Sequence, residues 1–78
     1  MATKITVPAN LAAALMTAAK AAGLVWASYP NGEAGWETNW RSSAKSVRLF
    51  CEAFAASHGL SISAVAGNPH CAGRISLS

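Results

Sequence analysis

The chain has 78 residues, of which 53% are hydrophobic and 12% are charged, a balance opposite to that of disordered chains. This length predicts one domain that spans residues 1–78. The formal net charge of +3 is compatible with an acidic partner or with nucleic acid, and the presence of only three acidic residues argues against a carboxylate-rich mimic of DNA.

Hydropathy and cysteine content predict where the protein works. No stretch approaches the roughly 20 apolar residues that span a bilayer. The alanine-rich segment 11–22 carries Lys20 and lacks the charged leader and leucine-rich core of a secretion signal. We therefore expect a cytoplasmic protein with no membrane partner, in which Cys51 and Cys71 are free thiols.

The first element is a helix preceded by a short extended segment at residues 5–7. Pro8 and Asn10 mark the helix start, as a first-turn proline and a capping residue. Small and apolar residues at helical spacing extend the helix over 9–22, and Gly23 provides a left-handed stop.

Two strands follow this helix. Residues 24–29 are rich in β-forming types and lead into the turn sequence Pro30-Asn31-Gly32. Bulky and polar side chains then alternate over 36–41, which is the period of a strand with one bulky and one polar face. The two strands are expected to form a hairpin.

The second half opens on the strongest helical pattern in the chain. The serines at 42–43 are suitable N-caps, apolar residues recur at three- and four-residue steps over 47–58, and Gly59 ends the helix. Alternation then predicts strands at 60–64 and 71–77, separated by a turn at 67–69.

The predicted fold class is α+β with the order αββαββ. Two helices pack on one face of a four-stranded antiparallel sheet, and the other face is left for water or a partner. Each half reads helix, Gly-Leu, strand, a turn of Gly, Asn and Pro, Ala-Gly, strand. This likeness suggests an internal pseudo-repeat, although any chain of this architecture needs turn residues at similar places.

An aromatic and basic cluster forms the candidate contact surface. Three of the six basic residues lie within 41–48, with no acidic residue among them, and two tryptophans precede or adjoin them. Trp and Arg often dominate protein interfaces, and the same residue types stack on bases and neutralise phosphates. The alternative is that the tryptophans form the core and the cations a solvated helix face. The candidate partner-binding residues are Tyr29, Trp36, Trp40, Arg41, Lys45 and Arg48.

Residues able to bind a metal or to carry out catalysis are poorly spaced for either task. Cys51 and His58 lie about two helical turns apart, and the adjacent His70 and Cys71 point to opposite faces of a strand. Structural zinc sites instead bring ligands in close pairs. Three glutamates and the absence of a phosphate-binding motif argue against an enzyme. We predict no metal, no cofactor and no catalysis, with a thiol enzyme that uses Cys71 as the weakest alternative.

These observations favour a non-catalytic protein-binding module. Small size and few reactive groups suit an accessory protein of a phage or mobile element, such as an anti-CRISPR inhibitor of a larger host protein or nucleoprotein complex. That expectation describes a kind of protein and rests on no shared motif. A small nucleic-acid-binding protein with the same basic-aromatic patch is the alternative. A homodimer through an edge strand at 71–77 is also expected.

Overall fold

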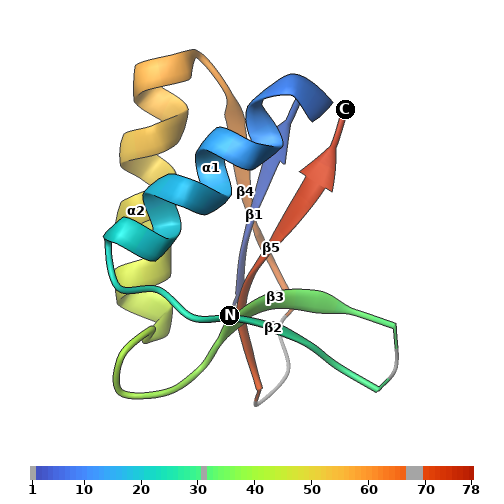
Figure 1. Ribbon diagram of the computed structural model, residues 1–78, viewed down its shortest axis with the longest axis vertical. Coiled ribbons are helices and arrows are strands. Elements are labelled where there is room, and N and C mark those ends of the chain that lie inside the picture. The colour runs from blue at the N-terminus through green and yellow to red at the C-terminus, as the bar shows by residue number, and fades with distance from the viewer. Residues whose placement is uncertain (1, 31, 67–69) are drawn as a thin grey trace.

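The computed structural model describes residues 2–30, 32–66 and 70–78, which form one mixed sheet and two helices. The elements are β1 (Ala2–Val7), α1 (Ala9–Ala21), β2 (Trp26–Ser28), β3 (Ala34–Glu37), α2 (Ala44–His58), β4 (Ser61–Val65) and β5 (Cys71–Leu77). The strand order is β2-β3-β5-β1-β4. Figure 1 shows both helices on the same side of the strands. The predicted α+β class is confirmed.

The sheet has five strands because the segment expected to be a short extended lead is itself a strand. β1 lies between β4 and β5, antiparallel to the first and parallel to the second, with Ile5 beside Ile62 and Ile75. The prediction of four antiparallel strands is therefore wrong. β2 and β3 pair as a hairpin, whereas β4 and β5 are separated by β1. The pseudo-repeat is not confirmed, and the turn expected at 67–69 lies outside the described residues.

The strand β5 is in the interior of the sheet. It is hydrogen-bonded to β3 on one side and to β1 on the other. The expectation that residues 71–77 form an edge strand is wrong, because β1 occupies the position that a second copy would need. The edge strands of the described sheet are β2 and β4.

The helix boundaries follow local chemistry. α1 begins after the extended Pro8, and Asn10 lies inside the helix and does not cap it. The hydroxyl of Ser43 accepts a hydrogen bond from the backbone N–H of Ser46 at 3.3 Å, which caps α2 as predicted. Gly59, at φ 64°, ends α2 in the left-handed conformation that favours glycine. No helix among the described residues has the length and apolar character needed to cross a bilayer.

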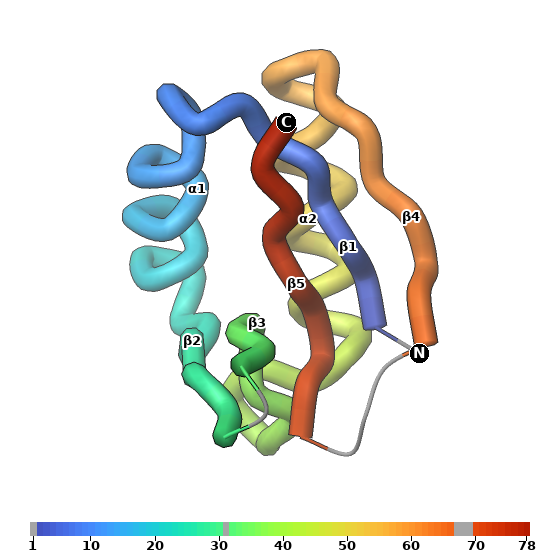
Figure 2. Tube along the Cα trace, turned by 90° about the vertical axis from the view of Figure 1, so that its right-hand side faces the viewer, coloured from blue at the N-terminus to red at the C-terminus, as the bar shows by residue number. Residues whose placement is uncertain are grey.

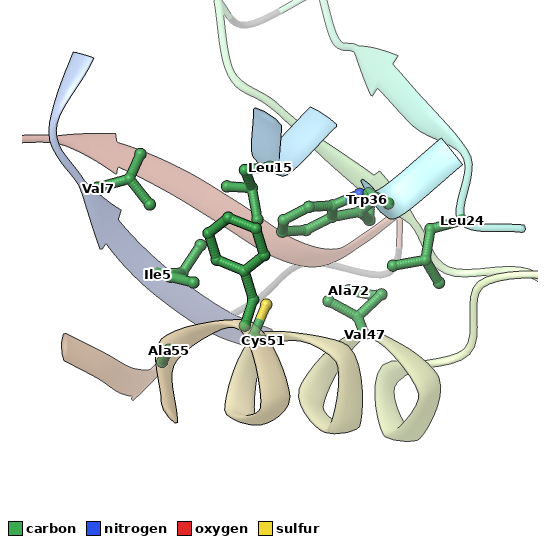
Figure 3. Close-up of a cluster of buried hydrophobic side chains, with 11 residues drawn as sticks. Ile5, Val7, Leu15, Leu24, Trp36, Val47, Cys51, Ala55 and Ala72 are labelled. Carbon is green, nitrogen blue, oxygen red and sulfur yellow. The ribbon is translucent and has the colours of Figure 1, made fainter. Parts of the chain in front are cut away.

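The core lies between the helices and one face of the sheet. Figure 2 shows α2 behind β5, β1 and β4, and α1 beside the sheet on the side of β2. Because side chains alternate along a strand, Ile5 faces the helices while its neighbour Lys4 lies on the opposite face, next to Arg74. The buried cluster comprises Ile5, Val7, Leu15, Ala19, Leu24, Trp36, Val47, Cys51, Phe54, Ala55 and Ala72 (Figure 3).

Trp36 is the largest fully buried side chain, and it packs directly on Gly73 of the neighbouring strand. A Cβ atom on Gly73 would lie 2.5 Å from Cγ1 of Val47 and 2.8 Å from Cε3 of Trp36, closer than real Cβ contacts. Trp26 and Phe50 meet the Trp36 ring edge to face, with centroids 5.3 Å and 6.1 Å away. Such aromatic pairs are each worth about 0.5–1.5 kcal/mol beyond the area they bury.

Replacing Gly73 with alanine is expected to lower the free energy of unfolding by about 1–3 kcal/mol, because overpacking forces the neighbouring side chains from their positions. Urea denaturation followed by circular dichroism measures the change. Ser76→Ala, on the same strand and partly exposed, is the control and should change stability by less than about 0.5 kcal/mol. Equal stability of the two variants would contradict the close packing at Gly73.

Candidate interaction surface

The two tryptophans expected on one strand face have opposite environments. β3 ends at Glu37 after a register irregularity between Trp36 and Glu37, so the alternation does not continue to Trp40. Trp36 is 0% exposed and Trp40 is 85% exposed. Trp36 therefore belongs to the core and contributes no contact area to a partner, whereas Trp40 is available.

The loop 38–43, which joins β3 to α2, is held in place by side-chain hydrogen bonds. The Oδ1 atom of Asn39 accepts from the backbone N–H groups of Arg41 and Ser42, at 2.8 Å and 3.0 Å. Its Nδ2 atom donates to the carboxylate of Glu37 at 3.0 Å. The buried hydroxyl of Ser42 donates to the backbone carbonyl of Glu37 at 2.7 Å. These bonds form an Asx-type turn that fixes the loop backbone.

This loop, the Trp40 loop, presents an aromatic ring and a cation together. The guanidinium carbon of Arg41 lies 4.6 Å from the centroid of the Trp40 ring. At an exposed site this cation–π contact is worth about 0.5–1 kcal/mol. A partner therefore meets an indole and a guanidinium that already lie together on a hydrogen-bonded loop, and a preformed backbone lowers the entropy cost of binding.

Tyr29 lies next to the Trp40 loop. It lines a shallow hollow of about 260 Å³ with Pro30, Glu37, Thr38, Asn39 and His70. The Tyr29 hydroxyl donates to the backbone carbonyl of His70, and the backbone N–H of Thr38 donates to the same oxygen at 3.2 Å. Burial, with smaller contributions from nearby negative charge, raises the pKa of Tyr29, so the hydroxyl keeps its proton and remains a donor.

Lys45 and Arg48 lie on a different part of the surface. They line a groove of about 340 Å³ between α2, β1 and β4. The Nε atom of Arg48 lies 3.5 Å from Oε1 of Glu52, and both side chains are about half exposed, so the pair contributes little to stability. The six predicted contact residues therefore divide into Tyr29, Trp40 and Arg41 at one site, Lys45 and Arg48 at another, and Trp36 in the core.

The thiols and imidazoles make local contacts. Cys51 and Cys71 are free and buried, and burial raises the pKa of Cys51 to about 12, so it is a neutral thiol at pH 7. The sulfur of Cys71 donates to the carbonyl of Gly73 at 3.1 Å. The His58 ring stacks on Phe54 at 4.2 Å. In the described part of the chain, no three His, Cys, Asp or Glu side chains gather as metal ligands would.

The residues that position the Trp40 loop, Asn39 and Ser42, were absent from the sequence-based candidates. The sequence pattern that predicts such a loop is an asparagine followed by a polar segment directly before a helix. Asn side chains often form hydrogen bonds with backbone groups two residues further along the chain. The strand expected over 36–41 concealed this signal.

No protein-family model, no curated protein and no solved structure matches the chain. The functional argument therefore depends on the surface, charges and contacts of this chain alone.

Asn39→Ala is expected to lower the free energy of unfolding by about 1–3 kcal/mol, because the buried N–H of Ser42 and the neighbouring N–H of Arg41 lose their acceptor. Thr38→Ala, in the same loop with an exposed side chain, is the matched control and should be close to neutral. Urea denaturation of both variants measures the difference. If the two variants are equally stable, the Asn39 bonds do not brace the loop.

The Cys51 pKa predicts a pH dependence. Above about pH 9 the unfolded chain loses this thiol proton, while the folded protein keeps it to about pH 12. The unfolded state then binds fewer protons, so the free energy of unfolding falls as pH rises, by up to about 1.4 kcal/mol per pH unit. Cys51→Ala lacks this contribution. In urea denaturation from about pH 8 to about pH 10, the free energy of unfolding should therefore fall more steeply for the wild type than for Cys51→Ala. Identical slopes for the two proteins would contradict the raised pKa of Cys51.

Proposed function

We propose that the chain is a non-catalytic protein-binding module whose contact surface centres on the Trp40 loop, with Tyr29 beside it. The observation that carries the proposal is an indole 85% exposed on a loop that hydrogen bonds hold in one conformation. Trp and Arg are the residue types most enriched among interface hot spots. The exposed Trp40 ring adds little to the core, whereas burying it against a partner removes a large apolar ring from solvent.

The size of a specific interface indicates how far the surface extends. A typical interface buries about 800 Å² on each partner, which is roughly a sixth of the 4543 Å² that this chain exposes. The contact must therefore reach beyond the Trp40 loop, from the hollow at Tyr29 towards the first turns of α2. On this view Lys45 and Arg48 are rim charges, which affect the association rate more than the affinity.

Nucleic-acid binding is the second candidate, and the stacked Trp40–Arg41 pair is the observation that favours it, since such pairs stack on bases. The distribution of charge on the surface gives less support to nucleic-acid binding. Arg48 and Arg74 each pair with a glutamate, the latter at 2.9 Å. The cations without an ion pair in the described residues come from separate elements: Lys4, Lys20, Arg41 and Lys45.

Three further properties belong to the same proposal. Blocking a larger host complex, as an anti-CRISPR-like inhibitor of a phage does, requires binding alone. A cytoplasmic location is supported by the two free thiols. A homodimer formed by sheet extension would use β4, an edge strand in which four of five residues are exposed.

The proposal predicts that a Trp40→Ala/Arg41→Ala variant folds normally and loses affinity for the protein partner about 30-fold or more, the effect of losing a hot spot of about 2 kcal/mol. The partner is isolated by affinity capture on the tagged wild type, purified, and titrated by calorimetry. Leu49→Ala, which removes another exposed apolar side chain on the outer side of α2, is the matched control and should bind unchanged.

Two outcomes would overturn this surface. Unchanged affinity of the folded double variant would place the contact elsewhere on the molecule. Tight binding of single-stranded DNA or RNA that weakens steeply between about 50 and 200 mM salt, and that the double variant loses, would favour the nucleic-acid candidate, because phosphate contacts release counterions.

A further inference from the structure

β4 has one free edge in the described sheet. β1 pairs with its other edge in continuous register, residues 2–6 against residues 61–65, and no described strand lies beyond it. Figure 2 shows β4 as the outermost strand on the side away from β2. In an antiparallel pair, every second residue points its N–H and C=O groups away from the partner strand. β4 therefore presents backbone groups that a further strand can bond.

The two edges of the described sheet differ in how far they discourage such pairing. β2 has three residues and is followed two positions later by Pro30, and short edge strands and proline both oppose sheet extension. β4 has five residues, of which four are exposed, and none of the five is a lysine, a proline or an acidic residue. Strand addition is therefore expected at β4 rather than at β2.

A groove of about 340 Å³ runs beside β4 on the α2 side of the sheet. Ile62 and Ala64 lie on that side, because Ile62 pairs with the core residue Ile5 and side chains alternate along a strand. Ala64 lines the groove together with Lys45 and Arg48 of α2. Both cations are exposed, and Lys45 has no ion pair with any described residue. The groove therefore offers positive charge to alternate side chains of an added strand.

We propose that β4 binds an extended acidic segment of a partner protein, which adds to the sheet as a sixth strand and places carboxylates against Lys45 and Arg48. In strand addition, backbone hydrogen bonds provide affinity and alternate side chains provide specificity. Arg48 already contacts Glu52 at 3.5 Å, but both side chains are about half exposed, and a guanidinium has donors left for a second carboxylate.

The charges favour this occupant over a second copy of the chain. The β4 strand of a second copy carries no acidic residue, and each copy has a net charge of +3, so pairing of two β4 strands brings no carboxylate to Lys45 from the added strand. The site does not include the Trp40 loop. It therefore goes beyond the proposed function and adds a second contact of defined chemistry to the binding module.

The experiment compares two capped peptides of about seven residues, long enough to span β4. The acidic probe alternates threonine with glutamate, and the neutral probe has glutamine in place of each glutamate. Each is titrated at low salt into ¹⁵N-labelled protein and followed by NMR. The acidic probe should bind about fivefold more tightly, which corresponds to about 1 kcal/mol for two exposed ion pairs.

Hydrogen exchange shows whether the bound probe pairs with the strand. At an acidic-probe concentration of about ten times its Kd, the amides of residues 61–65 that point away from β1 should exchange about tenfold more slowly, because only the unbound fraction leaves them open to water. The amides that point towards β1 are the internal reference, since the sheet protects them with or without the probe.

Two double variants test the groove charges. Lys45→Gln/Arg48→Gln leaves β4 unchanged and removes both cations, so the acidic and neutral probes should then bind about equally. Lys4→Gln/Lys20→Gln is the matched control. It removes the same charge from the opposite face of the sheet and from α1, and it should keep the fivefold preference.

Three results would overturn the proposal. The first is equal affinity of the two probes for the wild type, or a preference that survives in Lys45→Gln/Arg48→Gln. The second is binding that leaves hydrogen exchange over residues 61–65 unchanged. The third is a mass near twice 8.0 kDa for the free protein by light scattering with all of these amides already protected, which would assign the edge to a second copy. None of these results bears on the contact proposed for Trp40, which the probes do not use.

Discussion

The close packing of Trp36 on Gly73 determines most of what surrounds it. Because Gly73 has no side chain, the indole lies on β5 and Val47 of α2 reaches the same point. This contact joins the hairpin to the central strands and sets the position of α2 over the sheet. The chain leaves β3 directly after this contact, so that the loop to α2 begins after Glu37 and carries Trp40 outwards.

The fold separates two uses of tryptophan. Trp36 is fully buried in the core, and its indole N–H has no hydrogen-bond partner among the described residues. Trp40 is mostly exposed, on a loop whose backbone is bonded by Asn39, and its ring lies against the guanidinium of Arg41. The two tryptophans therefore have separate roles, whereas Asn39 serves both the stability of the fold and the position of the Trp40 loop.

Local chemistry explains which elements the sequence predicts. α2 carries its own cap and stop at Ser43 and Gly59, and the strand over 71–77 has clear alternation between turn residues, so both appear at the expected positions. β1 alternates as well, but its role as a central strand follows from pairing with residues more than 50 positions away, which no local pattern contains. At the candidate site, Trp40 and Arg41 were predicted, whereas the burial of Trp36 depended on where β3 ends.

The position of β1 between β4 and β5 links distant parts of the chain, with Thr3 beside Gly73. A ribosome-bound chain that lacks β5 leaves one side of β1 with unpaired backbone groups, and the packing surface for Trp36 does not yet exist. Strands that pair although they lie far apart in the sequence give a large contact order, and a large contact order slows folding. We therefore expect the described sheet to assemble as one cooperative unit, and only after β5 has been synthesised.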